Sequence, residues 1–217
     1  MKDKLLKKIL IPRSPLANKG NFGHALIYAG SDNFLGAAYL TCQSAIFGGA
    51  GYVDLCYDSP CFANSLPEVI YTKRENLKGI NLNRISSILF GNGLDYPNKW
   101  IQQDLDYLLL NYTKKLVVDA TGLKYLKNFL LKHNPNEICP QLILTPHIKE
   151  FCNLFDIGYI DSNVLNYEKY LNSILKIFSR CTIILKSYNT LIKDNKERFF
   201  IDKVNPGLAK AGSGDCY

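Results

Sequence analysis

The chain has 217 residues, and its 47% hydrophobic content is enough for the core of one large domain or two small ones. Its net charge of +7 comes from lysines spread along the chain, and the only tight basic group is Lys2, Lys4, Lys7 and Lys8, so we expect no nucleic-acid partner. No apolar stretch has the length of a membrane span, and the one near the amino end stops at Pro12, too short for a signal peptide.

Cysteine usage indicates a reducing compartment. The seven cysteines are an odd number and include no C-x-x-C pair, which argues against a disulfide framework or a zinc site. Most are flanked by apolar residues, so burial in the core is the default role for each. We therefore expect a soluble, cytoplasmic protein.

Short apolar runs alternate with amphipathic stretches along the chain. The predicted strands cover residues 25–29, 52–56, 69–72, 85–90, 116–118, 142–144, 182–185, 190–192 and 198–201. The predicted helices cover residues 35–47, a stretch between 97 and 112, residues 122–133, a short segment from 149, and a segment whose apolar face is Leu171, Ile174, Leu175 and Phe178. We expect the last two strands to form a hairpin across Asp194 and Asn195. This order predicts one α/β domain over residues 1–217, with a mainly parallel central sheet and helices on both faces.

Polar and glycine residues follow several of the predicted strands directly. In a parallel sheet the carboxyl ends of the strands share one edge, where ligands bind. The sequence therefore predicts a site of nucleotide size at this edge. The residues concerned are Gly30-Ser31, Gly91-Asn92-Gly93, Asp119, Thr145-Pro146-His147 and Lys186.

A run of small residues, Gly212-Ser213-Gly214, precedes Asp215 near the end of the chain. Such a run lets backbone N–H groups converge on an anion, and it usually opens a helix whose dipole adds to the site. The run predicts a phosphate cradle with a carboxylate at its rim, although Asp215 is also a favoured helix N-cap residue. The chain stops two residues after Asp215.

Together these residues resemble the ADP- or ATP-dependent NAD(P)H-hydrate dehydratases, a branch of the ribokinase-like superfamily. The resemblance extends over nearly the whole chain, and its motifs occur in the family's order. They are Asn18-Lys-Gly-Asn-Phe-Gly23, Leu26-Ile-Tyr-Ala-Gly-Ser31 with Gly36-Ala-Ala38, Gly49-Ala-Gly51, Gly91-x-Gly-Leu94, Thr145-Pro-His147 with Glu150-Phe151, Leu185-Lys186, and Asn205-Pro-Gly-Leu-Ala209.

The resemblance implies a repair reaction on a nicotinamide cofactor that carries a hydroxyl group on its ring. Phosphoryl transfer from ADP or ATP to that hydroxyl, followed by loss of phosphate, restores NADH or NADPH, with Mg²⁺ expected to accompany the nucleotide. It implies that Asp215 is the catalytic base. The substrate-binding residues would be Ala37, Gly93, His147 and Asp215, and the nucleotide-binding residues Lys186, Ser187, Asn189, Thr190, Ala211, Gly212, Ser213 and Gly214. No residue is assigned to a metal.

Three of these residues also have plainer interpretations. His147, after Thr-Pro, is equally consistent with a cap on the next helix, Lys186 with a solvated strand end, and Asp119 with a group that only orients the sheet edge. The sequence also departs from the family's motifs in several places. Asp95 replaces a glycine, Asp119-Ala-Thr-Gly-Leu-Lys124 lacks a second acid, Ile148-Lys149 replaces Pro-Gly, Ser187 replaces a glycine, and Ala211 replaces a glycine.

Relatives continue beyond the glycine loop, so we expect a domain that lacks its C-terminal part, with apolar sheet surface left exposed and a homo-oligomer as one way to cover it. Two alternatives to the dehydratase remain open. One is an inactive truncated remnant or weak nucleotide-binding protein. The other is a ribokinase-like kinase for vitamin precursors, which would share the Gly-x-Gly-Asp end but not Thr145-Pro-His147.

Overall fold

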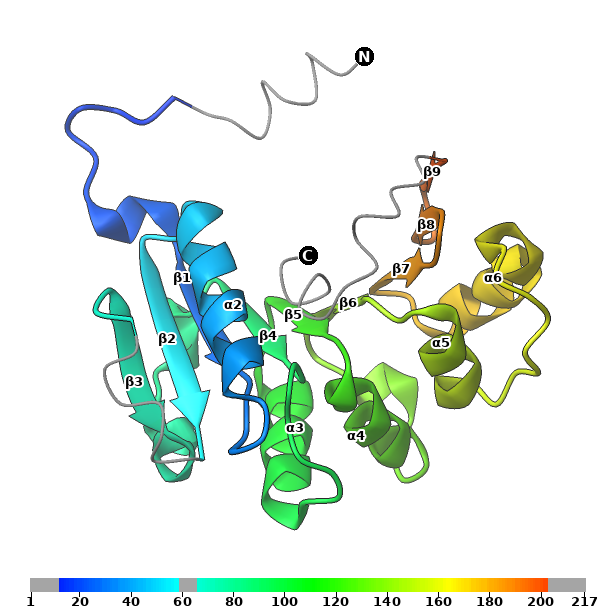
Figure 1. Ribbon diagram of the computed structural model, residues 1–217, viewed down its shortest axis with the longest axis horizontal. Coiled ribbons are helices and arrows are strands. Elements are labelled where there is room, and N and C mark those ends of the chain that lie inside the picture. The colour runs from blue at the N-terminus through cyan, green and yellow to red at the C-terminus, as the bar shows by residue number, and fades with distance from the viewer. Residues whose placement is uncertain (1–11, 59–65, 203–217) are drawn as a thin grey trace.

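The computed structural model describes residues 12–58 and 66–202, within which nine strands form one sheet (Figure 1). The order across the sheet is β3-β2-β1-β4-β5-β6-β7-β8-β9. Strands β1 to β7 pair in parallel, and β8 and β9 are antiparallel to their neighbours. The strands are β1 (His24–Tyr28), β2 (Tyr52–Tyr57), β3 (Val69–Lys73), β4 (Ser87–Phe90), β5 (Lys115–Val118), β6 (Gln141–Leu144), β7 (Cys181–Lys186), β8 (Thr190–Lys193) and β9 (Arg198–Ile201).

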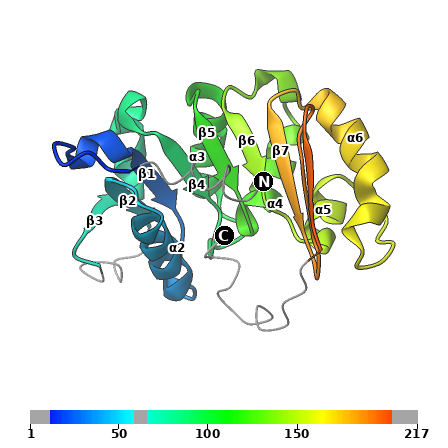
Figure 2. The same ribbon diagram turned by 90° about the horizontal axis from the view of Figure 1, so that it is seen from above.

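Helices lie on both faces of the sheet, as the β-α order predicts, but they are unevenly shared. Helix α2 lies against one face near β1 and β2, whereas α3, α4, α5 and α6 lie on the other (Figure 2). The α-helices are α2 (Leu35–Phe47), α3 (Lys99–Asn111), α4 (Thr121–Leu130), α5 (Ile148–Leu154) and α6 (Glu168–Ile177). Short 3-10 helices connect the larger elements: η1 (Lys19–Phe22), η3 (Arg74–Gly79), η4 (Leu82–Arg84), η5 (Pro135–Glu137) and η6 (Val164–Tyr167).

Side chains on β1 alternate between two apolar cores. In β1, Leu26 and Tyr28 belong to the larger core, which α3 to α6 cover. Ile27 belongs to a smaller core, completed by Ala38 and Cys42 of α2. The uneven sharing of helices therefore produces one large and one small core around the same sheet.

Part of the α2 face of the sheet is only half-buried among the described residues. Leu89 pairs in register with Val117, and Val117 with Ile143, which places the three side chains in one row. Each is half-buried. At the far edge Phe199 and Ile201 of β9 are exposed. These residues give the α2 face of the sheet a half-buried apolar row.

The ends of the elements follow from capping and turn chemistry. Asn98 caps α3 by accepting a hydrogen bond from the N–H of Trp100 at 2.9 Å. Helix α4 ends at Leu130, three residues earlier than predicted. Beyond it, the N–H groups of Lys132 and His133 both donate to the carbonyl of Phe129, and the following Asn134-Pro135 sequence disfavours helical backbone.

Two further observations concern membrane spans and cysteines. Within residues 12–58 and 66–202, no helix is long and apolar enough to cross a membrane. The cysteines in this part of the chain, Cys42, Cys56, Cys139, Cys152 and Cys181, are all free thiols.

Candidate functional site

The candidate site begins where the strand order changes direction, between β1 and β4. The chain leaves β1 toward one side of the sheet and returns to β4 on the other side, so the loops after these two strands diverge. Backbone hydrogen bonds tie the strand ends together: Gly30 N–H donates to the Asn92 carbonyl at 2.7 Å, and Gly91 N–H donates to the Tyr28 carbonyl at 3.0 Å. This point is the ligand-binding position of open α/β sheets.

Two glycines after β4 are required by the close packing of this loop. Gly91 has φ +132°, and a Cβ atom there would overlap the carbonyl oxygen of Asp119. Gly93 has φ +66°, and a Cβ atom there would lie 2.7 Å from the Cβ of Ala37 and 2.9 Å from that of Phe34. The structure therefore brings together Ala37 and Gly93, two residues predicted to bind substrate.

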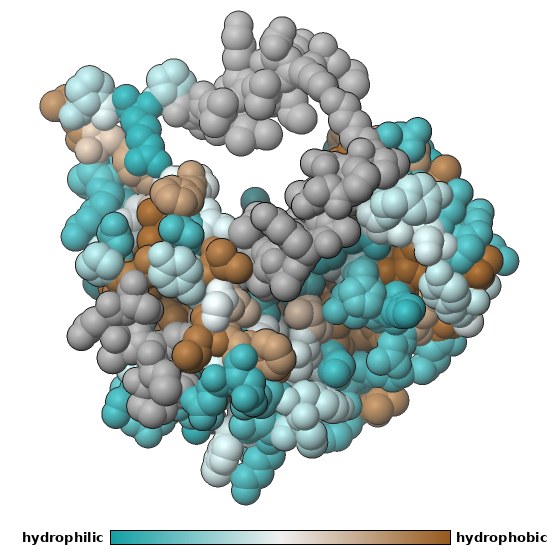
Figure 3. All heavy atoms as spheres, in the orientation of Figure 1, coloured by the Kyte–Doolittle hydropathy of each residue, from teal (hydrophilic) through white to brown (hydrophobic). Residues whose placement is uncertain are grey.

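An apolar surface adjoins this glycine loop. Phe34, Leu35 and Tyr39, at the start of α2, are exposed large side chains. Hydrophobic residues gather around this end of α2, at its lower end in the space-filling view (Figure 3). A flat, uncharged ring would find apolar contacts at this position.

The second feature of the rim is an ion pair between β5 and β7. The ammonium group of Lys186 lies 3.2 Å from Oδ1 of Asp119 and 3.4 Å from Oδ2. Asp119 also accepts hydrogen bonds from the backbone N–H of Ala120 at 2.8 Å and from Nδ2 of Asn92 at 3.4 Å. Lys186 is thus not a solvated strand end, and the orienting role considered for Asp119 agrees with its bonds to Ala120 and Asn92.

Two hydroxyl groups at the same carboxyl edge of the sheet are buried with no hydrogen-bond partner among the described residues. Ser31 follows β1 and Thr145 follows β6, and they are only 7% and 6% exposed. Buried polar groups are normally paired, so such hydroxyls are available to a bound molecule. They lie at strand ends that the sequence analysis identified, although neither was assigned a role.

His147 caps helix α5. Its Nδ1 accepts a hydrogen bond from the N–H of Glu150 at 3.2 Å, and the Glu150 carboxylate accepts one from His147 N–H at 2.9 Å. The structure therefore agrees with the capping interpretation of His147. Its backbone pairs with Lys186 in an isolated bridge. The ring is exposed, and its Nε2 lies 3.4 Å from Oε1 of Glu150.

The turn between β7 and β8 contains three residues predicted to bind nucleotide. Ser187 is exposed, and its N–H donates to the Asn189 carbonyl at 2.9 Å. Asn189 is buried, with its amide group 3.3 Å from Oδ1 of Asn163, and Thr190 pairs with Lys186 across the hairpin. Asn189 is therefore held against the loop before η6, whereas Ser187 is accessible. The antiparallel turn itself was not predicted.

The remaining predicted residues cannot be placed. Asp215, Ala211, Gly212, Ser213 and Gly214 lie outside the described residues. The described residues include no group of three or more histidine, cysteine or acidic side chains able to hold a metal ion.

Comparison with known proteins assigns the family. A family model described as NAD(P)H-hydrate dehydratase matches residues 25–217, which is most of the chain. The chain belongs to this family. The match bears out the resemblance carried by the sequence motifs, and it favours the dehydratase interpretation over a vitamin-precursor kinase.

Curated relatives of this dehydratase-family chain include longer proteins. The chain is 30% identical to the bifunctional NAD(P)H-hydrate repair enzyme of Thermofilum pendens over 95% of its own length, but spans 41% of that enzyme. It is 28% identical to the ADP-dependent (S)-NAD(P)H-hydrate dehydratase of Streptococcus thermophilus, covering 98% of the chain and 77% of the relative. The chain thus spans about two fifths of the bifunctional relative.

Solved structures share the fold. A ribokinase-like superfamily protein from Enterococcus faecalis aligns over all of this chain and 75% of its own, with TM-score 0.81 and 22% identity. The ADP/ATP-dependent NAD(P)H-hydrate dehydratase of Bacillus subtilis, co-crystallised with ATP and Mg²⁺, aligns over 99% of this chain and 76% of its own, with TM-score 0.76 and 26% identity. The ribokinase-like α/β fold expected from the sequence is therefore confirmed.

Proposed function

We propose that this chain is a nucleotide-dependent NAD(P)H-hydrate dehydratase. It would transfer the terminal phosphoryl group of ADP or ATP to the ring hydroxyl of NAD(P)H hydrate, and loss of phosphate would then restore NAD(P)H. The observation that carries the proposal is the rim at the carboxyl ends of the strands. There Gly93 meets Ala37 at the strand switch, Asp119 and Lys186 pair across the ends of β5 and β7, and two strand-end hydroxyls are buried without a partner among the described residues. The family match over residues 25–217 supports the same reaction.

We assign the substrate to the wall formed by Ala37 and Gly93. The close packing of this loop leaves a surface without side-chain bulk, against which the damaged nicotinamide ring can lie, next to the exposed side chain of Phe34. His147 would contact the substrate from the start of α5. Asp215 would take the proton of the substrate's ring hydroxyl, because the deprotonated hydroxyl oxygen is a better nucleophile.

We assign the nucleotide to the β7–β8 turn and the glycine loop. Lys186 carries a positive charge for the phosphates, and Ser187 offers an accessible hydroxyl group, whereas its N–H is already bonded to Asn189 within the turn. Asn189 and Thr190 would fix the turn's conformation. The backbone N–H groups of residues 211–214 would stabilise charge on the transferred phosphoryl group. These N–H groups stabilise the charge only when they point at the phosphoryl oxygens, so their effect depends on the loop keeping that conformation.

The described residues do not fit a protein-built Mg²⁺ site. Asp119 is the buried carboxylate at the rim, and it is already paired with Lys186. Mg²⁺ is commonly held by substrate phosphates and water, with few protein ligands. We therefore propose that Mg²⁺ arrives with the nucleotide, and we assign it no residue.

The proposed setting is the cytoplasm, where free thiols persist. A homo-oligomer would cover the half-buried row of Leu89, Val117 and Ile143. Light scattering on the purified chain tests this part of the proposal, because a mass of one chain in solution would refute it.

The test of the function is recovery of NADH from its hydrate. The chain is incubated with NADH hydrate, Mg²⁺ and either ADP or ATP, and the return of dihydronicotinamide absorbance is followed. Recovery that requires nucleotide supports the proposal. Folded protein that binds nucleotide but restores no NADH would overturn it in favour of an inactive nucleotide-binding protein.

A further inference from the structure

A cavity lies at the edge of the sheet opposite the candidate site, where the strands begin. It has a volume of about 530 Å³, within the range of small-molecule sites. His24 and Tyr52, the first residues of β1 and β2, both line it and are direct neighbours in the parallel register. Since β1 has five residues at about 3.3 Å each, this cavity is roughly 13 Å from the loop that follows β1 at the candidate active site.

The walls of this amino-edge cavity are largely apolar and aromatic. The rings of His24 and Tyr52 lie 5.4 Å apart at an angle of 36°, which gives a continuous aromatic surface. Ile70 of β3, Ile80 after η3 and Ile85 before β4 supply aliphatic walls. Gly20 and Gly23, near η1, add no side chains that would fill the space. These walls suit the apolar body of a ligand.

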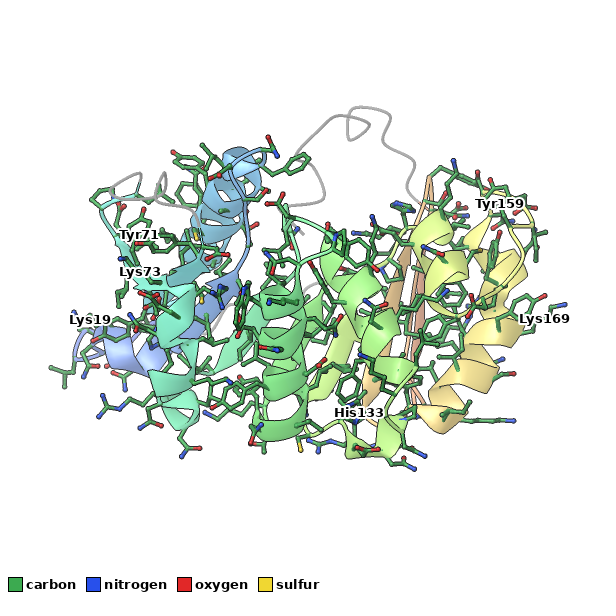
Figure 4. All side chains as sticks on the ribbon, turned by 90° about the horizontal axis from the view of Figure 1, so that it is seen from below. Lys19, Tyr71, Lys73, His133, Tyr159 and Lys169 are labelled. Carbon is green, nitrogen blue, oxygen red and sulfur yellow. The ribbon has the colours of Figure 1, made fainter. Side chains whose placement is uncertain are left out.

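The charged side chain in the cavity lining is a cation. Arg84 lines it, and no carboxylate of the described residues forms an ion pair with Arg84. The ammonium group of Lys19 lies 4.8 Å from the centroid of the Tyr52 ring, and Figure 4 shows Lys19 toward the edge of the sheet where the strands begin. The lining contains no acidic residue. The acid nearest in the register, Asp54, is buried within the sheet two positions after Tyr52.

One hydroxyl group completes the recognition chemistry. Oγ of Ser86 accepts a hydrogen bond from the backbone N–H of His24 at 3.1 Å, so the hydroxyl proton remains available for a ligand acceptor. Burial lowers the pKa of His24, so the imidazole contributes an uncharged surface at neutral pH. The cationic and donor groups therefore both favour an anion attached to an apolar body.

We propose that the amino-edge cavity binds a small organic monoanion, with an aromatic body against His24 and Tyr52 and a carboxylate-type group at Arg84. Ser86 donates a second hydrogen bond to the same anionic group. This binding site is separate from the proposed nucleotide and substrate sites, which lie at the other end of the strands, and it does not depend on them.

The proposal is tested by calorimetric titration of the full chain with 2-naphthoate, and with 2-naphthamide as a neutral molecule of the same shape. We expect naphthoate to bind more tightly than the amide. The Arg84→Gln change should weaken naphthoate binding by about tenfold, the worth of one charge-assisted hydrogen bond, and leave the amide unaffected. Ile80→Trp should remove binding of both compounds, because it fills the cavity.

Two controls separate this cavity from general charge effects and from the candidate active site. Lys115→Gln removes one positive charge from an exposed residue at the same edge, outside the cavity lining, and should leave naphthoate binding unchanged. Saturating ATP should not displace naphthoate. Absence of binding, displacement by ATP, or equal weakening by Lys115→Gln and Arg84→Gln would each overturn the proposal.

Discussion

The ammonium group of Lys186 lies 3.2 Å from Oδ1 of Asp119, which joins the carboxyl ends of β7 and β5 across the intervening β6. The two side chains are only 16% and 8% exposed. A pair this deeply buried is costly to break, because the partner that remains keeps its charge away from water. The pair therefore fixes the rim on which the proposed site depends.

The Lys186→Met change should destabilise the protein by about 3–5 kcal/mol, since it leaves the Asp119 carboxylate buried without its cation. Thermal unfolding measures the loss. Lys193→Met is the matched control: Lys193 is equally exposed, but its partner Glu168 lies 3.7 Å away and also pairs with Arg198. The control should cost about 1 kcal/mol or less. Similar losses for the two variants would contradict the role given to the buried pair.

The Gly93→Ala change should destabilise the loop after β4 by about 1–3 kcal/mol, because the new Cβ meets Ala37 and the φ of +66° disfavours L-residues. Adding Ala37→Gly removes one of the collisions and should restore part of the stability. Denaturant unfolding of both variants measures the difference. No recovery in the double variant would show that Ala37 does not confine Gly93.

Tyr28→Phe removes the hydroxyl that donates to Oδ2 of Asp104 at 2.7 Å. Burial already raises the pKa of Asp104, and the lost bond leaves its carboxylate with a more distant cation, Arg74, at 3.6 Å. We expect a loss of about 1–3 kcal/mol in unfolding free energy. Tyr112→Phe is the control, because Tyr112 is equally buried but its hydroxyl is 3.4 Å from its acceptor, Ile85 O. A larger loss of unfolding free energy in Tyr112→Phe than in Tyr28→Phe would contradict the stabilising role of the Tyr28–Asp104 hydrogen bond.

Asp54→Asn should stabilise the protein at neutral pH. Burial raises the pKa of Asp54 above its ordinary value of 3.8, although Thr72 and His24 oppose the shift. Ionisation is therefore harder in the folded state than in the unfolded state. Asp54 therefore does not destabilise the folded protein below pH 3.8, where its carboxyl group is protonated in both states. The free energy of unfolding falls as the pH rises through the folded-state pKa of Asp54.

The advantage of Asp54→Asn, measured as a difference in unfolding midpoint, should thus be largest near pH 7 and disappear toward pH 3.5. Each kcal/mol gained raises the midpoint by roughly 2–4 °C in a chain of this size. Burial lowers the pKa of His24 and the Asp54 carboxylate opposes that shift, so His24 is harder to protonate in Asp54→Asn. Its titration therefore further reduces the advantage of the variant as the pH falls. A midpoint difference that did not change with pH would contradict the assignment to Asp54.

The sequence predicted those parts of the structure that depend on local patterns. Apolar periodicity placed the α2 helix at residues 35–47, with the same limits as in the structure. The resemblance named Ala37 and Gly93 as substrate-binding residues, and the structure brings these two residues together. The sequence left two roles open for His147, a contact with substrate and a cap on the next helix. The structure shows the cap on α5.

Features that depend on the lateral order of strands were not predicted. Asp119 and Lys186 are 67 positions apart, and their pairing needs β5, β6 and β7 to lie side by side with matched ends. The amino-edge cavity draws its walls from several separate elements, so no local pattern marks it. The sequence motifs indicated the family, but they did not predict which buried polar side chains contact one another, such as Asp119 and Lys186.

The stoichiometry of repair tests the proposed phosphoryl transfer and elimination together. The chain is supplied with NADH hydrate and a limiting amount of ATP or ADP, and the NADH regained and the inorganic phosphate released are counted together. Asp215→Asn, which should retain nucleotide binding, provides the control. The account predicts one NADH for each phosphate in the unaltered chain and none in the variant. Phosphate release without NADH, or equal NADH recovery by Asp215→Asn, would contradict it.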